Sequence, residues 1–411
     1  MLNKQICFLE PPIGYLRDQL DPPFPLMYLS AVAERCGWQA QIVHMQTLQD
    51  KLPEADIYGV TSSSPQWPDT LKLSSRLFVE YSDKWRICGG SHISACPNNY
   101  YNSSFNTAVI GEGELALEQF LQMPKTGIIY GEPVKDLDCV PFPARHLINW
   151  SKYKRGIYWG KECLSLAVSM ITSRGCPFSC IFCSSHCVFG RRVRFRSVGN
   201  VVAEIHQVLD TLGYRGFNFH DDTFCVNRKR VADLCREFTP LDIVWRCLTR
   251  ADTVDHEILT AMKNSGCKEV ILGMESGSQK ILNNLRKGTT VEQNLRAMKL
   301  IKESGIQLKV GIIVGSPGET WETVKETEKL LKQCPPDFWN VSVFTPLPGS
   351  DVWNNPEQFD LKILTRDLTQ YQMVGKDFRG TVVVETEKMS KTDIEQARDE
   401  LIDLCTEISG T

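Results

Sequence analysis

The chain has 411 residues, of which 42% are hydrophobic and 23% are charged, and its formal net charge is −3. This length suits two or three domains with a large buried core, and the composition excludes a disordered, collagen-like or coiled-coil chain. The balance of 46 basic against 49 acidic side chains argues against nucleic acid as a partner. We see no run of about 18 apolar residues and no apolar leader, so we expect a cytoplasmic protein with no membrane partner.

The first 124 residues alternate short apolar segments with helical ones. Expected strands cover residues 5–9, 40–44, 57–61, 86–88 and 107–110, and expected helices cover residues 26–36, 68–81 and 114–122. Such alternation predicts a doubly wound, Rossmann-like α/β domain with a parallel sheet. Ligands of these sheets bind at the carboxyl ends of the strands, which here carry prolines, hydroxyl side chains and glycines.

Residues 125–163 contain Pro133, Pro141 and Pro143, and we expect them to form an irregular linker. A second alternation covers residues 164–345. Its expected strands are 164–172, 217–220, 243–248, 269–274, 308–314 and 338–344, and its expected helices are 197–212, 228–238, 255–265, 278–304 with a break near Gly288, and 320–333. Six βα units are too few to close an eight-stranded barrel, so we predict an open partial (β/α)6 barrel with its site at the carboxyl ends of the strands. Residues 346–411 are expected to form a small C-terminal cap, with a helix over 393–407.

Four arginines stand close together at positions 191, 192, 194 and 196. They are interpreted either as a solvated loop or salt-bridged edge, or as a contact to an anionic substrate or cofactor.

Sixteen cysteines are present, and most stand singly among apolar residues, as small buried side chains do. In a large chain without an export signal, metal binding or free thiols are expected rather than disulfides. Only Cys176, Cys180 and Cys183 form a tight group, spaced CxxxCxxC directly after the first barrel strand. Three thiolates in one loop can hold three irons of a cubane cluster and leave the fourth iron open to a small molecule. The alternatives are three structural thiols or a zinc site with Cys187 as its fourth ligand.

This cysteine motif and the order of the elements around it resemble the radical S-adenosylmethionine superfamily, over about residues 164–345. The resemblance implies a [4Fe–4S] cluster on the three cysteines, with S-adenosylmethionine bound at the open iron. One electron, from an external donor such as flavodoxin or ferredoxin, then cleaves S-adenosylmethionine. The products are methionine and a 5′-deoxyadenosyl radical, which takes a hydrogen atom from a small-molecule substrate.

The resemblance extends to the carboxyl ends of the later strands, through the segments 216–224, 245–252, 270–279 and 311–320. The contacts to S-adenosylmethionine that it implies are Phe182, Asp221, Arg250, Glu275, Gly315 and Pro317. The alternative interpretation of these residues is structural. The acidic residues would cap helices, and Arg250 would form a salt bridge at the barrel rim.

The first domain, residues 1–124, resembles the cobalamin-binding domain found ahead of the barrel in one large subgroup of that superfamily. The cobalamin contacts that this resemblance implies are Pro12, Thr61, Ser62, Ser63, Gly89, Gly90, Ser91, His92, Gly111, Glu112 and Glu114. The sequence departs from the older cobalamin-binding pattern because it has no Asp-x-His-x-x-Gly, and His44 lacks that frame. No histidine is therefore expected below the cobalt, and His92 is interpreted either as a corrin-side hydrogen-bond donor or as a surface histidine with its hydrogen bonds satisfied.

Together the two resemblances predict a cobalamin-dependent radical methyltransferase, which methylates an unactivated carbon or phosphorus through methylcobalamin. One alternative is cobalamin-associated radical chemistry without methyl transfer: cyclisation, ring contraction, oxidation or sulfur insertion. A nonenzymatic iron–sulfur or zinc module is a more distant alternative. Methylthiolation is disfavoured because the other N-terminal cysteines lack the spacing for a second cluster. The substrate and the oligomeric state are not predicted.

Overall fold

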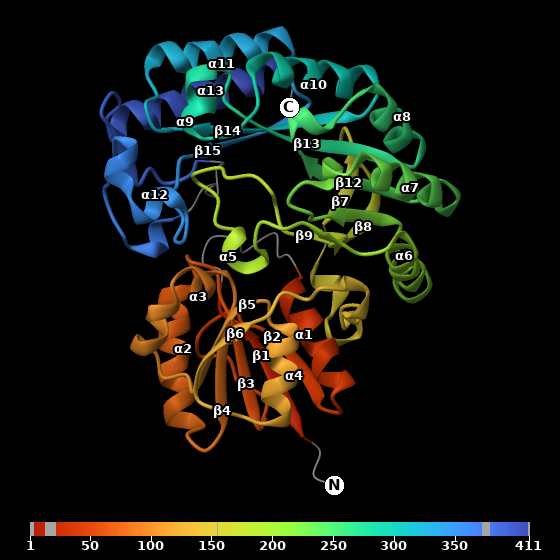
Figure 1. The fold of residues 1–411 in the computed structure, drawn as a ribbon, viewed down its shortest axis with the longest axis vertical. Coiled ribbons are helices and arrows are strands. Elements are labelled where there is room, and N and C mark those ends of the chain that lie inside the picture. The colour runs from red at the N-terminus through yellow and green to blue at the C-terminus, as the bar shows by residue number, and fades with distance from the viewer. Residues whose placement is uncertain (1–3, 13–21, 154, 372–378, 410–411) are drawn as a thin grey trace. The chain divides into compact units, whose positions relative to one another are not determined.

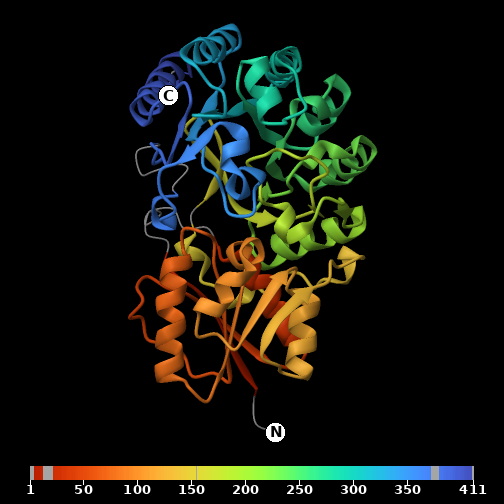
Figure 2. The ribbon, with the colours of Figure 1, turned by 60° about the vertical axis from the view of Figure 1, so that its left-hand side comes forward.

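The structure is a computed structural model, and it describes residues 4–12, 22–153, 155–371 and 379–409. The chain divides into two compact units (Figures 1 and 2). The N-terminal unit comprises residues 1–154, 184–194 and 367–370, and the barrel unit comprises residues 155–183, 195–366 and 371–411.

The N-terminal unit is built on one parallel sheet with the strand order β2-β1-β3-β4-β5-β6. Its strands are β1 (Gln5–Glu10), β2 (Gln39–His44), β3 (Ile57–Thr61), β4 (Trp85–Gly89), β5 (Thr107–Gly111) and β6 (Gly127–Gly131). Its helices are α1 (Phe24–Arg35), α2 (Trp67–Glu80), α3 (Ser91–Ala95), α4 (Glu114–Gln122) and α5 (His186–Phe189). The predicted doubly wound sheet is therefore confirmed, and the order reverses direction between β1 and β3, where such sheets bind ligands.

Alternate residues of the strands point to two separate cores, as the two-residue period of a strand requires. Cys7 and Leu9 of β1 pack with Leu73 of α2 on one face. Ile6 and Phe8 pack with the side chains of α1 and α4 on the other. Both faces of the sheet are thus covered by helices, which explains why its strands are continuously apolar.

Strand β6 lies in the segment that was expected to be an irregular linker, and in this respect the expectation was wrong. It pairs in parallel with β5 from Gly127 to Gly131. The prolines at 124 and 133 flank the strand rather than interrupt it, so its backbone N–H groups remain available for pairing.

The barrel unit is a curled seven-stranded sheet with the order β15-β14-β13-β12-β11-β8-β7. Its strands are β7 (Gly156–Trp159), β8 (Glu162–Met170), β11 (Gly216–Phe219), β12 (Val244–Thr249), β13 (Cys267–Glu275), β14 (Gln307–Val314) and β15 (Phe338–Val343). The helices are α6 (Val198–Leu212), α7 (Arg228–Phe238), α8 (His256–Asn264), α9 (Gln279–Asn284), α10 (Val291–Glu303), α11 (Trp321–Gln333), α12 (Asp351–Asn354) and α13 (Lys391–Ser409). Short strands β9 (Ser173–Arg174), β10 (Arg194–Phe195), β16 (Leu361–Ile363) and β17 (Val384–Thr386) complete the list. Six of the seven main strands are parallel, which confirms the partial barrel, and β7 adds an antiparallel edge.

Helices α6, α7, α8, α10 and α11 line the outer face of this curled sheet (Figure 1). Trp245 and Phe219 turn outward and meet Phe238 of α7, with ring centroids 6.1 and 5.5 Å away. Between such buried residues stand more accessible ones, such as Leu248, which is 39% exposed. The inner face of the sheet is therefore the more accessible of the two.

Most of the isolated cysteines are buried, as expected, and burial raises the pKa of their thiols. Cys7 and Cys88 belong to the core of the N-terminal unit. Cys225, Cys247 and Cys267 lie in the outer layer of the barrel, where the pKa of Cys247 is raised well above its usual value, chiefly by burial.

In the part of the chain that the structure describes, no helix combines the length and the apolar character needed to cross a membrane.

We predict that Gly266→Ala destabilises the barrel unit by about 2–5 kcal/mol, because left-handed strain and a steric clash add together. Gly266 has φ +97°, and a Cβ atom there would overlap the carbonyl oxygen of Ile243. Gly213→Ala is the matched control, since Gly213 has φ +67° with nothing within 4 Å of the added atom. Urea unfolding should show a clearly larger loss for Gly266→Ala, and equal losses would contradict the role given to the clash.

Candidate active site

The cysteine loop, residues 172–183, follows the carboxyl end of β8. Cys176, Cys180 and Cys183 are all partly buried there, and none forms a disulfide in the described part of the chain. Burial raises the pKa of Cys176 and of Cys180, while the positive charges of Lys287 and Arg250 act to lower the pKa of Cys180. Nearby cations favour the thiolate, which is the form that binds metal.

Among the described residues, no group of three His, Cys, Asp or Glu side chains converges on a point where a single metal ion could bind. A cubane cluster does not need such convergence, because each thiolate binds a different iron. Three partly accessible thiols on one short loop, with cations beside one of them, therefore fit this cluster.

Asp221, which follows β11, fastens the start of the cysteine loop. Its carboxylate accepts hydrogen bonds from the backbone N–H of Thr172, the Thr172 hydroxyl and the Ser173 hydroxyl, all at 2.6 Å. These three bonds account for the buried carboxylate without a ligand. The structure thus gives Asp221 an anchoring role, and its contact with S-adenosylmethionine stays a prediction.

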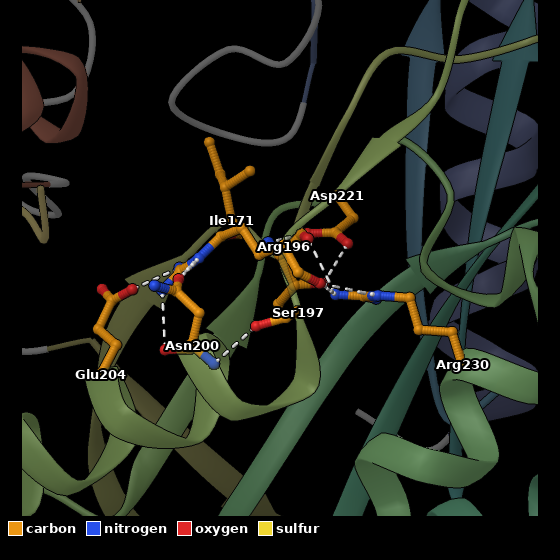
Figure 3. Close-up of polar contacts among 8 residues, drawn as sticks. Ile171, Arg196, Ser197, Asn200, Glu204, Asp221 and Arg230 are labelled. Atoms are coloured by element: carbon orange, nitrogen blue, oxygen red, sulfur yellow. Dashed lines mark hydrogen bonds and ion pairs between the residues drawn. The ribbon is translucent and has the colours of Figure 1, made fainter. Parts of the chain in front are cut away.

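Arg196 and Arg230 hold the carbonyl groups of the same stretch of backbone (Figure 3). Arg196 forms a buried ion pair with Glu204 and donates to the Ile171 carbonyl at 3.0 Å. Arg230 of α7 donates to the Thr172 carbonyl at 2.9 Å. The loop that carries the cysteines is therefore fixed at its base by several charge-assisted hydrogen bonds.

Two members of the basic run thus form salt bridges, which was one of its two interpretations. Arg196 belongs to the network above, and Arg194 pairs with Glu112 inside the N-terminal unit. Glu112, predicted to contact cobalamin, also accepts from the backbone N–H of Val134 at 3.1 Å. A buried carboxylate held in this way has a structural role, and its cobalamin contact stays a prediction.

Arg250, at the end of β12, lies against the cysteine loop. Its guanidinium stacks 3.5 Å from the ring centroid of Phe178 and forms two 3.0 Å hydrogen bonds with Asp252. It also donates to the Lys287 carbonyl at 2.7 Å. This is the rim salt bridge that local reading suggested, and the stacking links it to the loop.

Glu275, at the end of β13, adopts φ +63°, an uncommon conformation for a residue other than glycine. The pairing of β13 with β14 is irregular at this point. The Glu275 carboxylate accepts a hydrogen bond from Lys287 Nζ at 2.7 Å, and both side chains are largely buried. A Cβ at Gly273 would come within 2.8 Å of both groups, so this glycine makes room for the pair. Such local strain is typical of functional sites.

The loop after β14 is organised by Glu319. Its buried carboxylate accepts from the backbone N–H groups of Gly315 and Ser316, and burial raises its pKa to about 7. Gly315 has φ +83°, and a Cβ there would lie 2.9 Å from Ile394 of α13. The Pro317 carbonyl accepts from the Asn284 amide at 2.8 Å. Packing and loop closure alone therefore explain the glycine at position 315. The contacts of Gly315, Pro317 and the partly buried Phe182 with S-adenosylmethionine stay predictions.

In the N-terminal unit, the ends of β3 and β4 approach each other closely. Gly90 has φ +104°, and a Cβ there would lie 2.7 Å from Thr61 Oγ1 and 2.8 Å from the Ser62 carbonyl oxygen. The Ser62 hydroxyl is buried and has no hydrogen-bond partner among the described residues. These strand ends therefore lie close together, and the cobalamin contacts expected of Thr61, Ser62, Ser63, Gly89 and Gly90 stay predictions.

Two residues that sequence reasoning missed connect these loops. Gln66 donates to the Pro11 carbonyl at 2.9 Å and accepts from the backbone N–H of Ser63 at 3.0 Å, which joins the loops at the switch point. Ser94 Oγ donates to the Gly90 carbonyl at 2.8 Å and accepts from the Gly111 N–H at 3.0 Å. Both act across long sequence separations, and no local pattern marks them.

The remaining predicted cobalamin residues lie at element ends. Ser91 is exposed at the start of α3, Glu114 is buried at the start of α4, and Pro12 is partly buried after β1.

His92 has protein partners on both ring nitrogens. Nδ1 lies 3.1 Å from Ser64 Oγ, and Nε2 lies 2.9 Å from the Asn99 amide nitrogen. The ring packs 4.7 Å from that of Trp67 and is 1% exposed. Burial lowers the pKa of His92 to about 4. This arrangement is that of a neutral histidine with protein partners, as the second interpretation had it, but the surface position expected there was wrong because the ring is buried.

Comparison with known proteins agrees with this geometry. A family model described as the radical SAM superfamily matches residues 170–331. An uncharacterized methyltransferase of Pyrococcus horikoshii is 30% identical over 371 residues, which cover 84% of this chain and 78% of the relative. The anaerobic magnesium-protoporphyrin IX monomethyl ester cyclase of Rubrivivax gelatinosus is 33% identical over 246 residues, covering 59% of this chain but only 42% of the cyclase.

A solved structure shares the fold. The cobalamin-dependent S-adenosylmethionine radical enzyme OxsB, with aqua-cobalamin and S-adenosylmethionine bound, aligns with a TM-score of 0.77 and 17% identity. The alignment covers 97% of this chain and 66% of that one.

We predict that Asp221→Asn weakens the cysteine loop. Losing the charge of a buried acceptor of three hydrogen bonds should lower the free energy of unfolding by about 2–4 kcal/mol. Iron bound per chain after anaerobic reconstitution should fall as well. Asp233→Asn is the control, because Asp233 makes a 2.9 Å ion pair with the exposed Arg236. Wild-type iron content and stability in Asp221→Asn would contradict the anchoring role.

We predict a pH-dependent loss of stability from His92. Its pKa is about 4 in the folded protein, against a reference value of 6.5, so the unfolded chain binds the extra proton first as the pH falls. The contribution is fully present above pH 6.5 and is lost toward pH 4, for a total of about 3 kcal/mol. Urea unfolding of wild type and His92→Gln at pH 7 and pH 5 tests this. An equal loss in both proteins would show that His92 is not the source.

Proposed function

Because this chain belongs to the radical SAM superfamily, we propose that it is a cobalamin-dependent methyltransferase that acts on an unactivated carbon or phosphorus of a small molecule. The observation that carries the proposal is the cysteine loop, held at its base by Asp221, with Lys287, Arg250 and Glu275 gathered near Cys180. The 30% identical relative named as a methyltransferase supports the methyl-transfer step. The fold shared with a cobalamin-dependent radical enzyme supports the choice of cobalamin.

In this proposal Cys176, Cys180 and Cys183 hold the [4Fe–4S] cluster. When bound, the cluster supplies the electron that cleaves S-adenosylmethionine, and cobalamin supplies the methyl group. The electron reaches the cluster from an external donor such as flavodoxin or ferredoxin.

The residues around the loop have separate tasks. Lys287 and Glu275 carry opposite charges beside Cys180, which suits a zwitterionic amino acid and the hydroxyls of a ribose. Arg250, already paired with Asp252, positions Phe178 and the Lys287 backbone rather than offering its charge to a ligand. Phe178 thereby shields one side of the loop from water.

In the N-terminal unit, Ser62 and the glycine turns at 90 and 111 offer hydroxyl and backbone groups at the ends of β3, β4 and β5. Such a surface suits the amide groups of a corrin ring. Because both ring nitrogens of His92 have protein partners, we assign it to the scaffold that shapes this surface.

A second candidate is radical cyclisation without methyl transfer, which the 33% identical magnesium-protoporphyrin ester cyclase favours. The two candidates differ in one product. Methyl transfer consumes a second S-adenosylmethionine and releases S-adenosylhomocysteine, whereas cyclisation does not.

We predict that the anaerobically reconstituted protein, given dithionite and hydroxocobalamin, forms both 5′-deoxyadenosine and S-adenosylhomocysteine. Cys176→Ala should lower 5′-deoxyadenosine formation by more than about 100-fold, beyond the usual effect of outer-shell changes. Cys187→Ala is the matched control and should retain both cleavage and iron.

Liquid chromatography with mass spectrometry measures both products. If Cys176→Ala cleaves S-adenosylmethionine as fast as the wild type does, the proposed function is wrong. Formation of 5′-deoxyadenosine without S-adenosylhomocysteine would favour the cyclisation candidate. Loss of activity and metal in Cys187→Ala would favour a four-thiolate site.

A further inference from the structure

The inner face of the barrel sheet carries an excess of positive charge near the amino ends of its strands. Residues 246 and 248 of β12 lie on this face, because Trp245 and Cys247 between them are buried in the outer layer. Neighbouring strands add further charged groups to the same face. We call Arg246, Glu269 and Lys309 the inner-face cluster.

Arg246 is already partly satisfied within the cluster. Its Nε donates to Asn218 Oδ1, and its Nη1 lies 3.6 Å from Glu269 Oε1. The long ion pair leaves the Glu269 oxygen without a hydrogen bond among the described residues. The ion pair between Arg246 and Glu269 is thus long, and it leaves the hydrogen-bonding capacity of both groups incompletely used.

Lys309 of β14 faces the same carboxylate with less support. Among the described residues, none forms a hydrogen bond with its amine or an ion pair within 4 Å. The charges that act on it are Glu269, Arg246 and Arg155, and burial, the largest effect, lowers the pKa of Lys309. Two cations, Arg246 and Lys309, therefore share one carboxylate in a partly buried place, where like charges repel more strongly than in water.

We propose that the inner-face cluster binds an anionic group of the substrate, a carboxylate or a phosphate. The inference deepens the proposed function and rests on it, since it names the class of small molecule that the proposed enzyme would act on. An anion between Arg246 and Lys309 would relieve their repulsion, and a guanidinium matches the paired oxygens of either group.

The position of the cluster also limits the shape of the substrate. Arg250, stacked on the cysteine loop, follows Arg246 by four residues, which corresponds to about 13 Å along a strand. Between them Leu248 presents an apolar side chain that is 39% exposed. The substrate is therefore elongated, with an apolar middle, its reacting atom near the cysteine loop and its anionic end at the cluster.

Calorimetric titration of the cluster-loaded full-length protein tests this with octanoate, octyl phosphate and 1-octanol as probes. We expect at least one anionic probe to bind wild type about tenfold or more tightly than the alcohol, and the stronger of the two identifies the preferred anion. Lys309→Met and Arg246→Gln should each abolish that preference. Lys309→Met is the safer variant, because it leaves no hydrogen-bonded partner behind. Arg236→Gln removes an exposed positive charge from α7 and should keep the preference.

Equal binding of the three probes to wild type, or a preference that survives in both cluster variants, would overturn the inference. The cleavage assay is read separately. If the protein prefers an anionic probe but forms no 5′-deoxyadenosine, the anionic site is supported and the proposed function is wrong. If the protein cleaves S-adenosylmethionine but binds the anionic probes no more tightly than 1-octanol, the proposed function stands and this inference is wrong.

Discussion

The three hydrogen bonds from residues 172 and 173 to the Asp221 carboxylate are the constraint on which the rest of the barrel site depends. They join the end of β8 to the end of β11, the two strands that flank the cysteine loop. Because the acceptor is charged and buried, each bond resists competition from water. Arg230 and Arg196 hold the carbonyl groups of the same stretch, so its donors and acceptors are both satisfied. The cysteines thus start from a fixed base rather than from a loose loop.

In the barrel site, charged side chains form ion pairs with other side chains of the protein. Arg250 forms an ion pair with Asp252, and Lys287 forms one with Glu275. Such pairs orient the groups, and one partner can be exchanged for a ligand without leaving a buried charge alone. The inner-face cluster differs, because its positive side chains outnumber its carboxylates. This excess of positive charge is the reason why we infer an anionic ligand there.

Much of the fold could be predicted from the sequence, because strand periods and glycine stops are local. The cysteine spacing and the strand-end residues point to a candidate site for the same reason. Individual roles were harder, since partners are set by tertiary contacts. Asp221 and Arg250 stand where they were expected, yet their partners are the loop itself. Gln66, Ser94 and Lys309 were missed because their partners lie on other strands or loops, and β6 was missed because prolines flank it.

The buried cysteines give the protein an uneven sensitivity to air. Thiols such as Cys7, Cys88 and Cys247 are kept protonated by burial, and a protonated thiol reacts slowly with oxidants. The partly accessible thiols of the cysteine loop, together with the exposed Cys139 and Cys163, take the damage first. We therefore expect oxidation to reach the cysteine loop first, while the buried core and with it the fold stay intact.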